Sequence, residues 1–248
     1  MNELTVIAVP VFDRSETQTR YTIEFVDQMQ RGVVGNWLCV IVDNGSTSEH
    51  TQGFLAQLDD PRFHVIHNET NLGYGAAANQ GIAYGIEHGA EYVCVINNDV
   101  EFLNPNWIEE AFLKYLRDNP TWLMGARMIE QNAWTDFDGR GYIPYLEGYL
   151  YVCHKDLWLD LNGFDPKFIA YFEDVDFCLR AKQAGYELVQ SPDFEWYDAA
   201  GFKNATPAWV PIHHFGGATG YQPDFDYQSV TKDSMAYFRS KWFPITAG

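Results

Sequence analysis

The chain is short of basic residues. It has 16 lysines and arginines against 34 aspartates and glutamates, which gives a formal charge of −18 at pH 7. A surface this acidic repels phosphate backbones and anionic membranes, so the composition argues against a nucleic-acid acceptor. The same acidity makes a divalent cation a suitable partner for any anionic substrate that binds here.

The chain also lacks long apolar runs and paired cysteines. No apolar run approaches the length of a membrane span, and the N-terminus lacks the basic segment and apolar core of a signal peptide. The four cysteines form no C-x-x-C pair, and three lie in apolar runs, where a thiol packs as a small hydrophobic group. We therefore expect no transmembrane segment, reduced buried thiols and a cytoplasmic protein.

Apolar β-type runs alternate with helix-type segments through the first hundred residues. The expected strands are Leu4–Val11, Trp37–Asp43, Phe63–His67 and Glu91–Ile96, and the expected helices are Thr17–Gln30, Ser48–Leu58 and Gly75–His88. This order predicts the α/β class, with a doubly wound, mostly parallel sheet. Ligands of such sheets bind beyond the carboxyl ends of the strands.

The second half of the sequence is less regular. We expect a helix over residues 106–117, a strand over 148–154 and a helix over 175–184, and the chain after Pro192 has loop character. No internal repeat or low-complexity linker divides the 248 residues. We therefore expect one domain over residues 1–248, with a soft change near residue 100 and no sign of the oligomeric state.

Polar residues collect at two predicted strand ends. Asp43 opens the segment Asp43-Asn44-Gly45-Ser46-Thr47, and Asp99 closes Asn97-Asn98-Asp99. Asp43 could accept hydrogen bonds from a base or a ribose, and Asp99 could hold Mg²⁺ or Mn²⁺ together with substrate phosphates. The alternative for both segments is an ordinary polar turn with a helix cap.

Three further groups could carry chemistry. Gly73 and Gly75 precede a predicted helix, whose N-terminus can hold a phosphate, although close helix packing explains the glycines as well. Glu173 and Asp174 stand side by side in an aromatic setting, which raises the pKa of a carboxyl group and suits a general base. Asp176 and Arg180 have the spacing of a structural helix pair. His213 and His214 form a second metal-capable pair, and we take the other five histidines as structural.

Taken in order, these segments resemble the family 2 glycosyltransferases. The motifs are V-D-N-G-S-T at 42–47, N-L-G-Y-G-A-A-A-N-Q-G-I at 71–82, I-N-N-D-V at 96–100, G-F-D at 163–165, Y-F-E-D-V-D-F-C-L-R-A at 171–181, A-G-Y at 184–186 and H-F-G-G-A-T at 214–219. The last groups look most like the bacterial rhamnosyltransferase-like branch. The resemblance runs from residue 4 to about 220, nearly the whole chain.

The resemblance implies a GT-A fold, in which a nucleotide-sugar-binding half (residues 1–100) merges with an acceptor-binding and catalytic half (101–248). It implies an inverting transfer, a single in-line displacement at the anomeric carbon. Carried over by position, the nucleotide-binding residues would be Pro10, Val11, Asp43, Asn71, Gly73 and Asn98.

The resemblance also implies a metal and a base. Asp99 would bind the divalent cation, Mn²⁺ or Mg²⁺, with His214 or His213 completing the ligands. Asp174 would deprotonate the acceptor hydroxyl, with Glu173 beside it. The commoner family motif has two or three acids where this chain has Asn97-Asn98-Asp99, so the protein gives the metal less negative charge.

The expected donor is a UDP- or dTDP-sugar, and the expected acceptor is a glycan, a lipid-linked molecule or a small molecule. One alternative is a sugar-phosphate nucleotidyltransferase, but that class has a Gly-rich basic loop after the first strand, and residues 9–14 contain no glycine. The other alternative is a protein that binds a nucleotide sugar without turnover, against which the presence of Glu173 and Asp174 argues.

Overall fold

The fold is built on a central sheet of seven strands. A computed structural model describes residues 3–130, 142–194, 211–216 and 226–244. The strands, in spatial order, are β10 (Glu187–Gln190), β6 (Trp122–Gly125), β9 (Leu150–His154), β4 (Tyr92–Ile96), β1 (Thr5–Val11), β2 (Trp37–Asn44) and β3 (Phe63–Asn68). All neighbours pair in parallel except β9, which runs antiparallel to both β4 and β6. The predicted α/β class with a mostly parallel sheet is confirmed.

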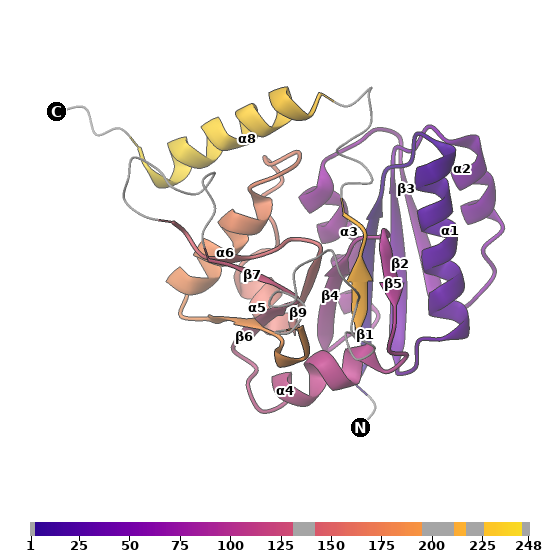
Figure 1. Ribbon diagram of the computed structural model, residues 1–248, viewed down its shortest axis with the longest axis horizontal. Helices are drawn as coiled ribbons and strands as arrows, with labels where there is room; N and C mark the ends of the chain where they lie inside the picture. The colour runs from indigo at the N-terminus through magenta and orange to yellow at the C-terminus, as the bar shows by residue number, and fades with distance from the viewer. Residues whose placement is uncertain (1–2, 131–141, 195–210, 217–225, 245–248) are drawn as a thin grey trace, which may run out of the picture.

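Helices cover both faces of this sheet, because alternate residues of its central strands are buried on opposite sides. In β1, Ile7 and Val9 pack with Phe25 of α1, whereas Val6 and Ala8 pack with Ile82 of α3. The helical segments are α1 (Glu16–Arg31), α2 (Glu49–Ala56), α3 (Tyr74–Glu87), η1 (Glu109–Leu113), α4 (Lys114–Leu116), α5 (Lys155–Asp160), α6 (Glu173–Gln183), η3 (Pro192–Phe194) and α8 (Tyr227–Trp242). In Figure 1, α1 and α2 lie to the right and α6 and α8 to the left.

Small residues let α3 approach the sheet closely. A Cβ atom added at Gly85 would come within 2.1 Å of Val6, and one at Gly81 within 2.8 Å of Ala8. The helix ends as predicted, with Gly89 just past its last turn at a φ of +91°. Close packing also applies to Gly75, one of the two glycines for which it was an open alternative, because a Cβ atom added there would lie 2.8 Å from Phe164.

Two short strand pairs lie beside the central sheet. β5 (Val100–Phe102) pairs antiparallel with β11 (Ile212–His214), and β7 (Met128–Ile129) pairs antiparallel with β8 (Tyr145–Leu146). Because β5 starts directly after Asp99, its pairing with β11 brings a distant histidine segment to the end of β4.

The structure differs from the sequence-based expectation in several places. It contains β6 and β10 of the central sheet, the short strands β5, β7 and β8, and the helix α5, none of which was expected. α6 begins at Glu173 rather than at 175, so both acids lie in its first turn. The segment after Pro192 was expected to be loop throughout, and this was wrong, because it contains α8. The buried face of α8 includes Thr231, Ser234 and Phe238, so polar residues at core positions hide the helical period.

The predicted behaviour of the cysteines is confirmed, since all four are buried and free. Among the described residues, no helix has the length and apolar character that crossing a membrane requires.

Candidate active site

The carboxyl ends of β1, β2 and β4 bring the candidate nucleotide-binding residues to one edge of the sheet. Asp43 lies at the end of β2 and is almost fully buried. One of its carboxylate oxygens accepts a hydrogen bond from the Ser46 backbone N–H (3.0 Å), and the other lies 3.1 Å from Nδ1 of His67. From the sequence, His67 was expected to be structural. Its place follows from the register of β2 and β3, which sets Asp43 opposite His67.

Asn44 ties the neighbouring loop to β2. Its side-chain amide donates to Asn71 Oδ1 (2.9 Å) and to the Gly73 carbonyl (3.2 Å), and its oxygen accepts from the Leu72 backbone N–H (3.1 Å). Asn71 Oδ1 also accepts from the Gly73 N–H (2.8 Å). A side chain at Gly45 would collide with the backbone of residues 70–71. Asn71 is exposed, so the loop presents a polar side chain, anchored through its Oδ1 atom, at the rim of the site.

Gly73 joins this loop to the second half of the chain. It has a φ of +95°, which favours glycine, and an added Cβ atom would lie 2.9 Å from the Ile169 backbone. The next residue, Tyr74, donates its backbone N–H to the Ile169 carbonyl (3.0 Å). The first N–H group of α3 is thus already bonded within the protein.

The two remaining candidates on β1 differ in exposure. Val11 is 1% exposed and packs in the core on the α1 face, whereas Pro10 is half-buried. Of these two side chains, only Pro10 is accessible to a ligand.

The structure brings Asp99 and His214 together. The His214 Nε2 atom lies 3.2 Å from Asp99 Oδ1, and the Phe215 backbone N–H donates to the Asp99 carbonyl (3.0 Å). The imidazole of His214 stacks on the ring of Tyr149, with centroids 4.0 Å apart. Adjacent residues of a strand point to opposite sides, so His213 instead lies 3.9 Å from Glu101.

A carboxylate oxygen and an imidazole nitrogen form a donor set that Mn²⁺ or Mg²⁺ can share with phosphates and water. Within the described residues, no three histidine, cysteine, aspartate or glutamate side chains gather as a metal site. In the part of the chain that the structure describes, the candidate ligands brought together are therefore Asp99 and His214. Residues 217–219 of the H-F-G-G-A-T motif lie outside the described chain.

Glu173 and Asp174 sit in the first turn of α6, after an unusual turn. Tyr171 and Phe172 both have a φ of +66°, which is a strained conformation for residues other than glycine. Burial, and then the charge of Asp174, raises the pKa of Glu173. Burial also raises the pKa of Asp174, although the Val175 backbone N–H donates to its carboxylate (2.8 Å) and opposes the shift. Glu173 Oε2 is buried and has no hydrogen-bond partner.

Asp176, the third acid of this segment, has a structural setting. It is fully buried, and Arg180 approaches its carboxylate at 2.8 Å. Lys241 and Trp242 of α8 bind the other oxygen, at 2.7 and 2.9 Å.

The segment Gly148–Tyr149 lies between the acidic pair Glu173–Asp174 and the pair formed by Asp99 and His214. Gly148 packs against the side chain of Asp174, where an added Cβ atom would lie 3.1 Å from the Asp174 Cβ. Tyr149 stacks on His214, the partner of Asp99. Tyr74 donates its hydroxyl to the Gly148 carbonyl (3.1 Å), and burial together with the charges of nearby Glu173, Asp99 and Asp174 holds its pKa well above the usual range. Neither tyrosine was named as a site residue from the sequence, although Tyr74 stands between Gly73 and Gly75 in the N-L-G-Y-G motif.

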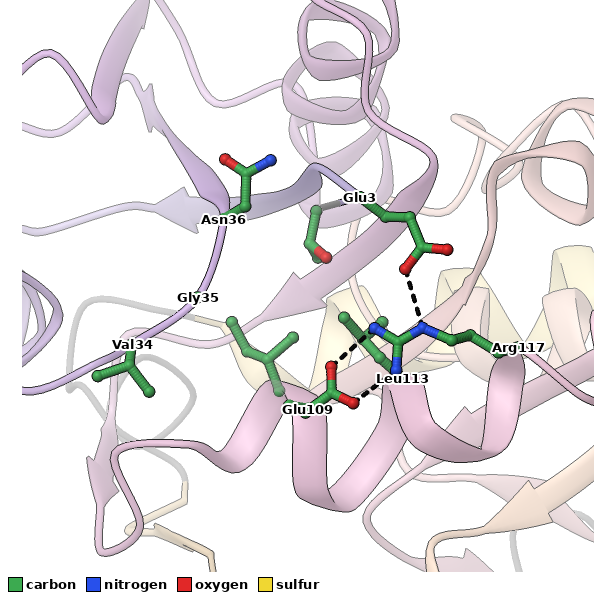
Figure 2. A pocket seen from close by; sticks show the side chains of 9 residues that line it. Glu3, Val34, Gly35, Asn36, Glu109, Leu113 and Arg117 are labelled. Carbon is green, nitrogen blue, oxygen red and sulfur yellow. Dashed lines mark hydrogen bonds and ion pairs between the residues drawn. The ribbon is translucent and has the colours of Figure 1, made fainter. Parts of the chain in front are cut away.

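A small cavity lies at the opposite, amino-terminal edge of the sheet. Figure 2 shows Arg117 there between two carboxylates, and its guanidinium lies 2.9 Å from Glu3 and 2.8 Å from Glu109. Thr5, the first residue of β1, and Asn36, which precedes β2, also line it. None of the candidate site residues does.

Comparison with known proteins shows the family to which the chain belongs. The family model described as Glycosyl transferase family 2 matches residues 6–179. Among curated proteins, the chain is similar to the low-salt glycan biosynthesis hexosyltransferase Agl10 of Haloferax volcanii, at 25% identity over 175 residues, covering 61% of this chain and 55% of that protein. The chain spans only 27% to 55% of the length of the curated relatives that it matches.

Two solved structures resemble the fold. One is the mannosyltransferase PcManGT from Pyrobaculum calidifontis in complex with GDP-Man and Mn²⁺, with a TM-score of 0.57 and 17% identity over 77% of this chain and 55% of the other. The second is S. aureus TarS 1-349 in complex with UDP-GlcNAc, with a TM-score of 0.53 and 17% identity over 76% of this chain and 56% of the other. With the mostly parallel sheet and its flanking helices, these likenesses establish an α/β GT-A fold.

Proposed function

This chain belongs to glycosyl transferase family 2 and is a glycosyltransferase, and from that premise we propose that it transfers a sugar from a UDP- or dTDP-sugar to an acceptor hydroxyl with inversion. The observation that carries this proposal is the bridge formed by Gly148 and Tyr149. One residue packs on Asp174 and the next stacks on His214 beside Asp99. The proposed base and the metal-capable pair therefore each contact one of two adjacent residues. This arrangement suits attack by the acceptor on one face of a sugar and departure of the diphosphate from the other face.

The donor nucleotide is proposed to lie along the ends of β1 and β2. Asp43 receives the base and ribose, and Pro10 and Val11 form the neighbouring strand end. Asn71 and Gly73 lie next to the ribose and pyrophosphate, with Asn98 on the β4 side. The hydrogen bonds of Asn44 to Asn71 and Gly73 support this, since they hold that loop in place before a ligand arrives.

Asp99 and His214 are the proposed ligands of a divalent cation. Both side chains are largely buried and lie within 3.2 Å of each other. When bound, the cation would offset the negative charge that develops on the departing diphosphate. His213 stays a weaker candidate, because Glu101 is its neighbour.

The proposed chemistry is a single displacement. The acceptor oxygen forms a bond to the anomeric carbon while the bond to the diphosphate oxygen breaks, and the hydroxyl proton passes to the Asp174 carboxylate. The raised pKa of Asp174 brings it close to working pH, where a general base is most effective. Glu173, raised further, stays protonated beside it, which limits the negative charge at the site.

The bound donors of the structural neighbours, GDP-Man and UDP-GlcNAc, belong to those proteins. The acceptor proposed here is a glycan, a lipid-linked molecule or a small molecule, and a nucleic acid is disfavoured by the charge of −18. A single GT-A domain, the rhamnosyltransferase-like branch and a cytoplasmic location belong to the same proposal.

Calorimetric titration with UDP, dTDP and GDP, each with and without Mn²⁺, tests the donor site. Metal-dependent binding of UDP or dTDP is the expected result. Binding of GDP alone would overturn the donor assignment, and no binding of any of the three would overturn the nucleotide site itself.

Asp174→Asn separates a transferase from a protein that only binds its donor. Turnover should fall about 100- to 10,000-fold while diphosphate binding persists, because a general base contributes that much to rate. Asp160→Asn, an exposed acid on α5, is the control and should leave turnover unchanged. Unchanged turnover in Asp174→Asn would remove Asp174 as the base.

A further inference from the structure

Thr22 lies in the middle of a chain of buried hydrogen bonds behind the candidate site. Its hydroxyl donates to Asp13 Oδ2 (2.6 Å) and accepts from the side-chain amide of Asn98 (2.8 Å). Asp13 Oδ2 also accepts from Thr51 (2.9 Å). Thr22 and Asp13 are 1% and 2% exposed, so water does not compete for these bonds. No sequence motif marks either residue.

The direction of each hydrogen in this chain is determined. Burial raises the pKa of Asp13 to about 6, so its carboxylate is ionised in neutral solution and can only accept. A hydroxyl has one hydrogen, and Thr22 gives it to Asp13. Thr22 can therefore only accept from Asn98, so the Asn98 amide must turn its NH₂ group toward Thr22.

The consequence is a fixed orientation for Asn98. With its NH₂ group held by Thr22, the amide oxygen is directed away from the buried chain. Within the described residues this side chain makes only the one hydrogen bond, to Thr22. Asn98 is half-buried at the carboxyl end of β4, directly before the metal-capable Asp99. The Asn98 amide oxygen can thus accept a hydrogen bond at the place where the nucleotide sugar is expected to bind.

We infer that Asp13 and Thr22 are positioning residues, which set the Asn98 amide so that its oxygen accepts a hydrogen bond from a hydroxyl group of the nucleotide sugar. This rests on the proposed function. The reversed amide would present an NH₂ group instead, which suits a phosphate oxygen and leaves a hydroxyl without its acceptor. The buried relay thereby selects a ribose hydroxyl at this point, a group that nucleoside diphosphates also carry.

Thr19 provides a matched control on the same helix. Its hydroxyl lies 2.7 Å from those of both Ser48 and Thr51 and 3.1 Å from the Ser15 carbonyl, and it has no bond to Asn98. Thr19 is 4% exposed. A purely structural role for these hydroxyls therefore predicts similar effects of Thr19→Val and Thr22→Val.

The test is calorimetric titration of UDP, dTDP and GDP with Mn²⁺ into the full chain and its variants, with thermal unfolding measured in parallel. Using the diphosphate that the wild type binds, Thr22→Val should raise the Kd about 5- to 10-fold, since one hydrogen bond loses its acceptor. Thr22→Ser, which restores the hydroxyl, should restore the Kd. Thr19→Val should lower the unfolding temperature at least as much as Thr22→Val, yet leave the Kd unchanged.

A double-mutant cycle with Asn98→Ala shows whether Thr22 acts through Asn98. Thr22→Val should weaken binding no further once Asn98 is alanine. Equal losses of affinity in the Thr19 and Thr22 variants, or additive losses in the cycle, overturn the positioning role while the proposed function stands. A wild-type chain that binds none of the three diphosphates overturns the proposed function, and this inference with it.

Discussion

Glu173 and Asp174 place two carboxyl groups side by side where water has little access. The turn before them holds Tyr171 and Phe172 at positive φ, and such strain persists only when the surrounding contacts hold it. Glu173 Oε2 has no hydrogen-bond partner. Unfavourable groups of this kind are found where a site is arranged for chemistry rather than for stability.

The pH dependence of turnover follows from Asp174. Burial raises its pKa to about 7 and that of neighbouring Glu173 to about 8, and the two protons belong to the pair. A general base must be unprotonated, so kcat/KM should rise with pH through about 7 rather than through the usual carboxyl range near 4. A pH–rate profile measures this. A profile that is flat from about pH 5 to 8 would contradict a base with a raised pKa.

Replacing Glu173 with glutamine should stabilise the protein at high pH. Because the folded-state pKa of Glu173 is raised, its protonated form favours folding, and that stability is lost as the pH rises through about 8. Glu173→Gln cannot ionise, so its unfolding temperature at about pH 9 should exceed that of the wild type by roughly 5 °C. The two should agree near pH 4.

The control for this comparison is Glu187→Gln, an exposed acid at the start of β10. Its unfolding temperature should equal that of the wild type at both pH values. An unfolding temperature of Glu173→Gln that follows the wild type up to pH 9 would show that Glu173 ionises in the folded protein without penalty.

Among the secondary-structure elements, α8 is bonded to the segment that precedes the acidic pair and to α6. Ser234 Oγ donates to the Ala170 carbonyl (2.6 Å), the residue just before the strained turn. Lys241 Nζ lies 2.7 Å from both Asp165 and Asp176. α8 lies outside the part of the chain that the family model matches, which ends at residue 179. A helix beyond the family region thus holds the turn that carries the proposed base.

Ser234→Ala should lower kcat about 3- to 10-fold, because the Ala170 carbonyl loses its partner and the turn relaxes. The KM for the donor should change little, since the hydrogen bonds and ion pairs of α8 given above run to Ala170, Asp165 and Asp176 rather than to the nucleotide residues. Ser240→Ala is the control, because Ser240 is exposed and its hydrogen bond among the described residues goes to Tyr237 of its own helix. Steady-state kinetics of both variants measure kcat and the donor KM. A raised donor KM with an unchanged kcat in Ser234→Ala would contradict this role of α8.

The order of strands and helices in the first half could be predicted from the sequence. The strands β1, β2 and β4 are buried on both faces, which makes each a largely apolar run, whereas β3 at the edge of the sheet is half-buried. α8 could not be predicted, because Thr231 and Ser234 occupy its buried face. In the site, single residues such as Asp99 and Asp174 could be named from motifs. The contacts of Tyr149 with His214 and of Thr22 with Asn98 join distant segments, and no local pattern encodes them.

At the scale of the whole molecule, the net charge of −18 opposes the binding of any nucleoside diphosphate. The edge of the sheet adds to this opposition through the carboxylates of Asp43 and Asp99, which lie at the ends of β2 and β4. Among these neighbours, the positive charge that a diphosphate requires has to be brought by a cation. Metal and nucleotide should therefore bind together more strongly than either binds alone.

This predicts a joint effect on thermal unfolding. UDP or dTDP alone, and Mn²⁺ alone, should shift the unfolding temperature little. Together, at about 100 times the Kd, they should raise it by about 5–10 °C, since a ligand that binds only the folded state stabilises it by roughly 2.7 kcal/mol at that excess. Asp99→Asn should abolish the joint shift, whereas Glu101→Gln, which alters the acid beside His213, should retain it. A full shift by the nucleotide in EDTA would instead move the phosphate site to backbone N–H groups, and loss of the shift only in Glu101→Gln would make His213 the ligand.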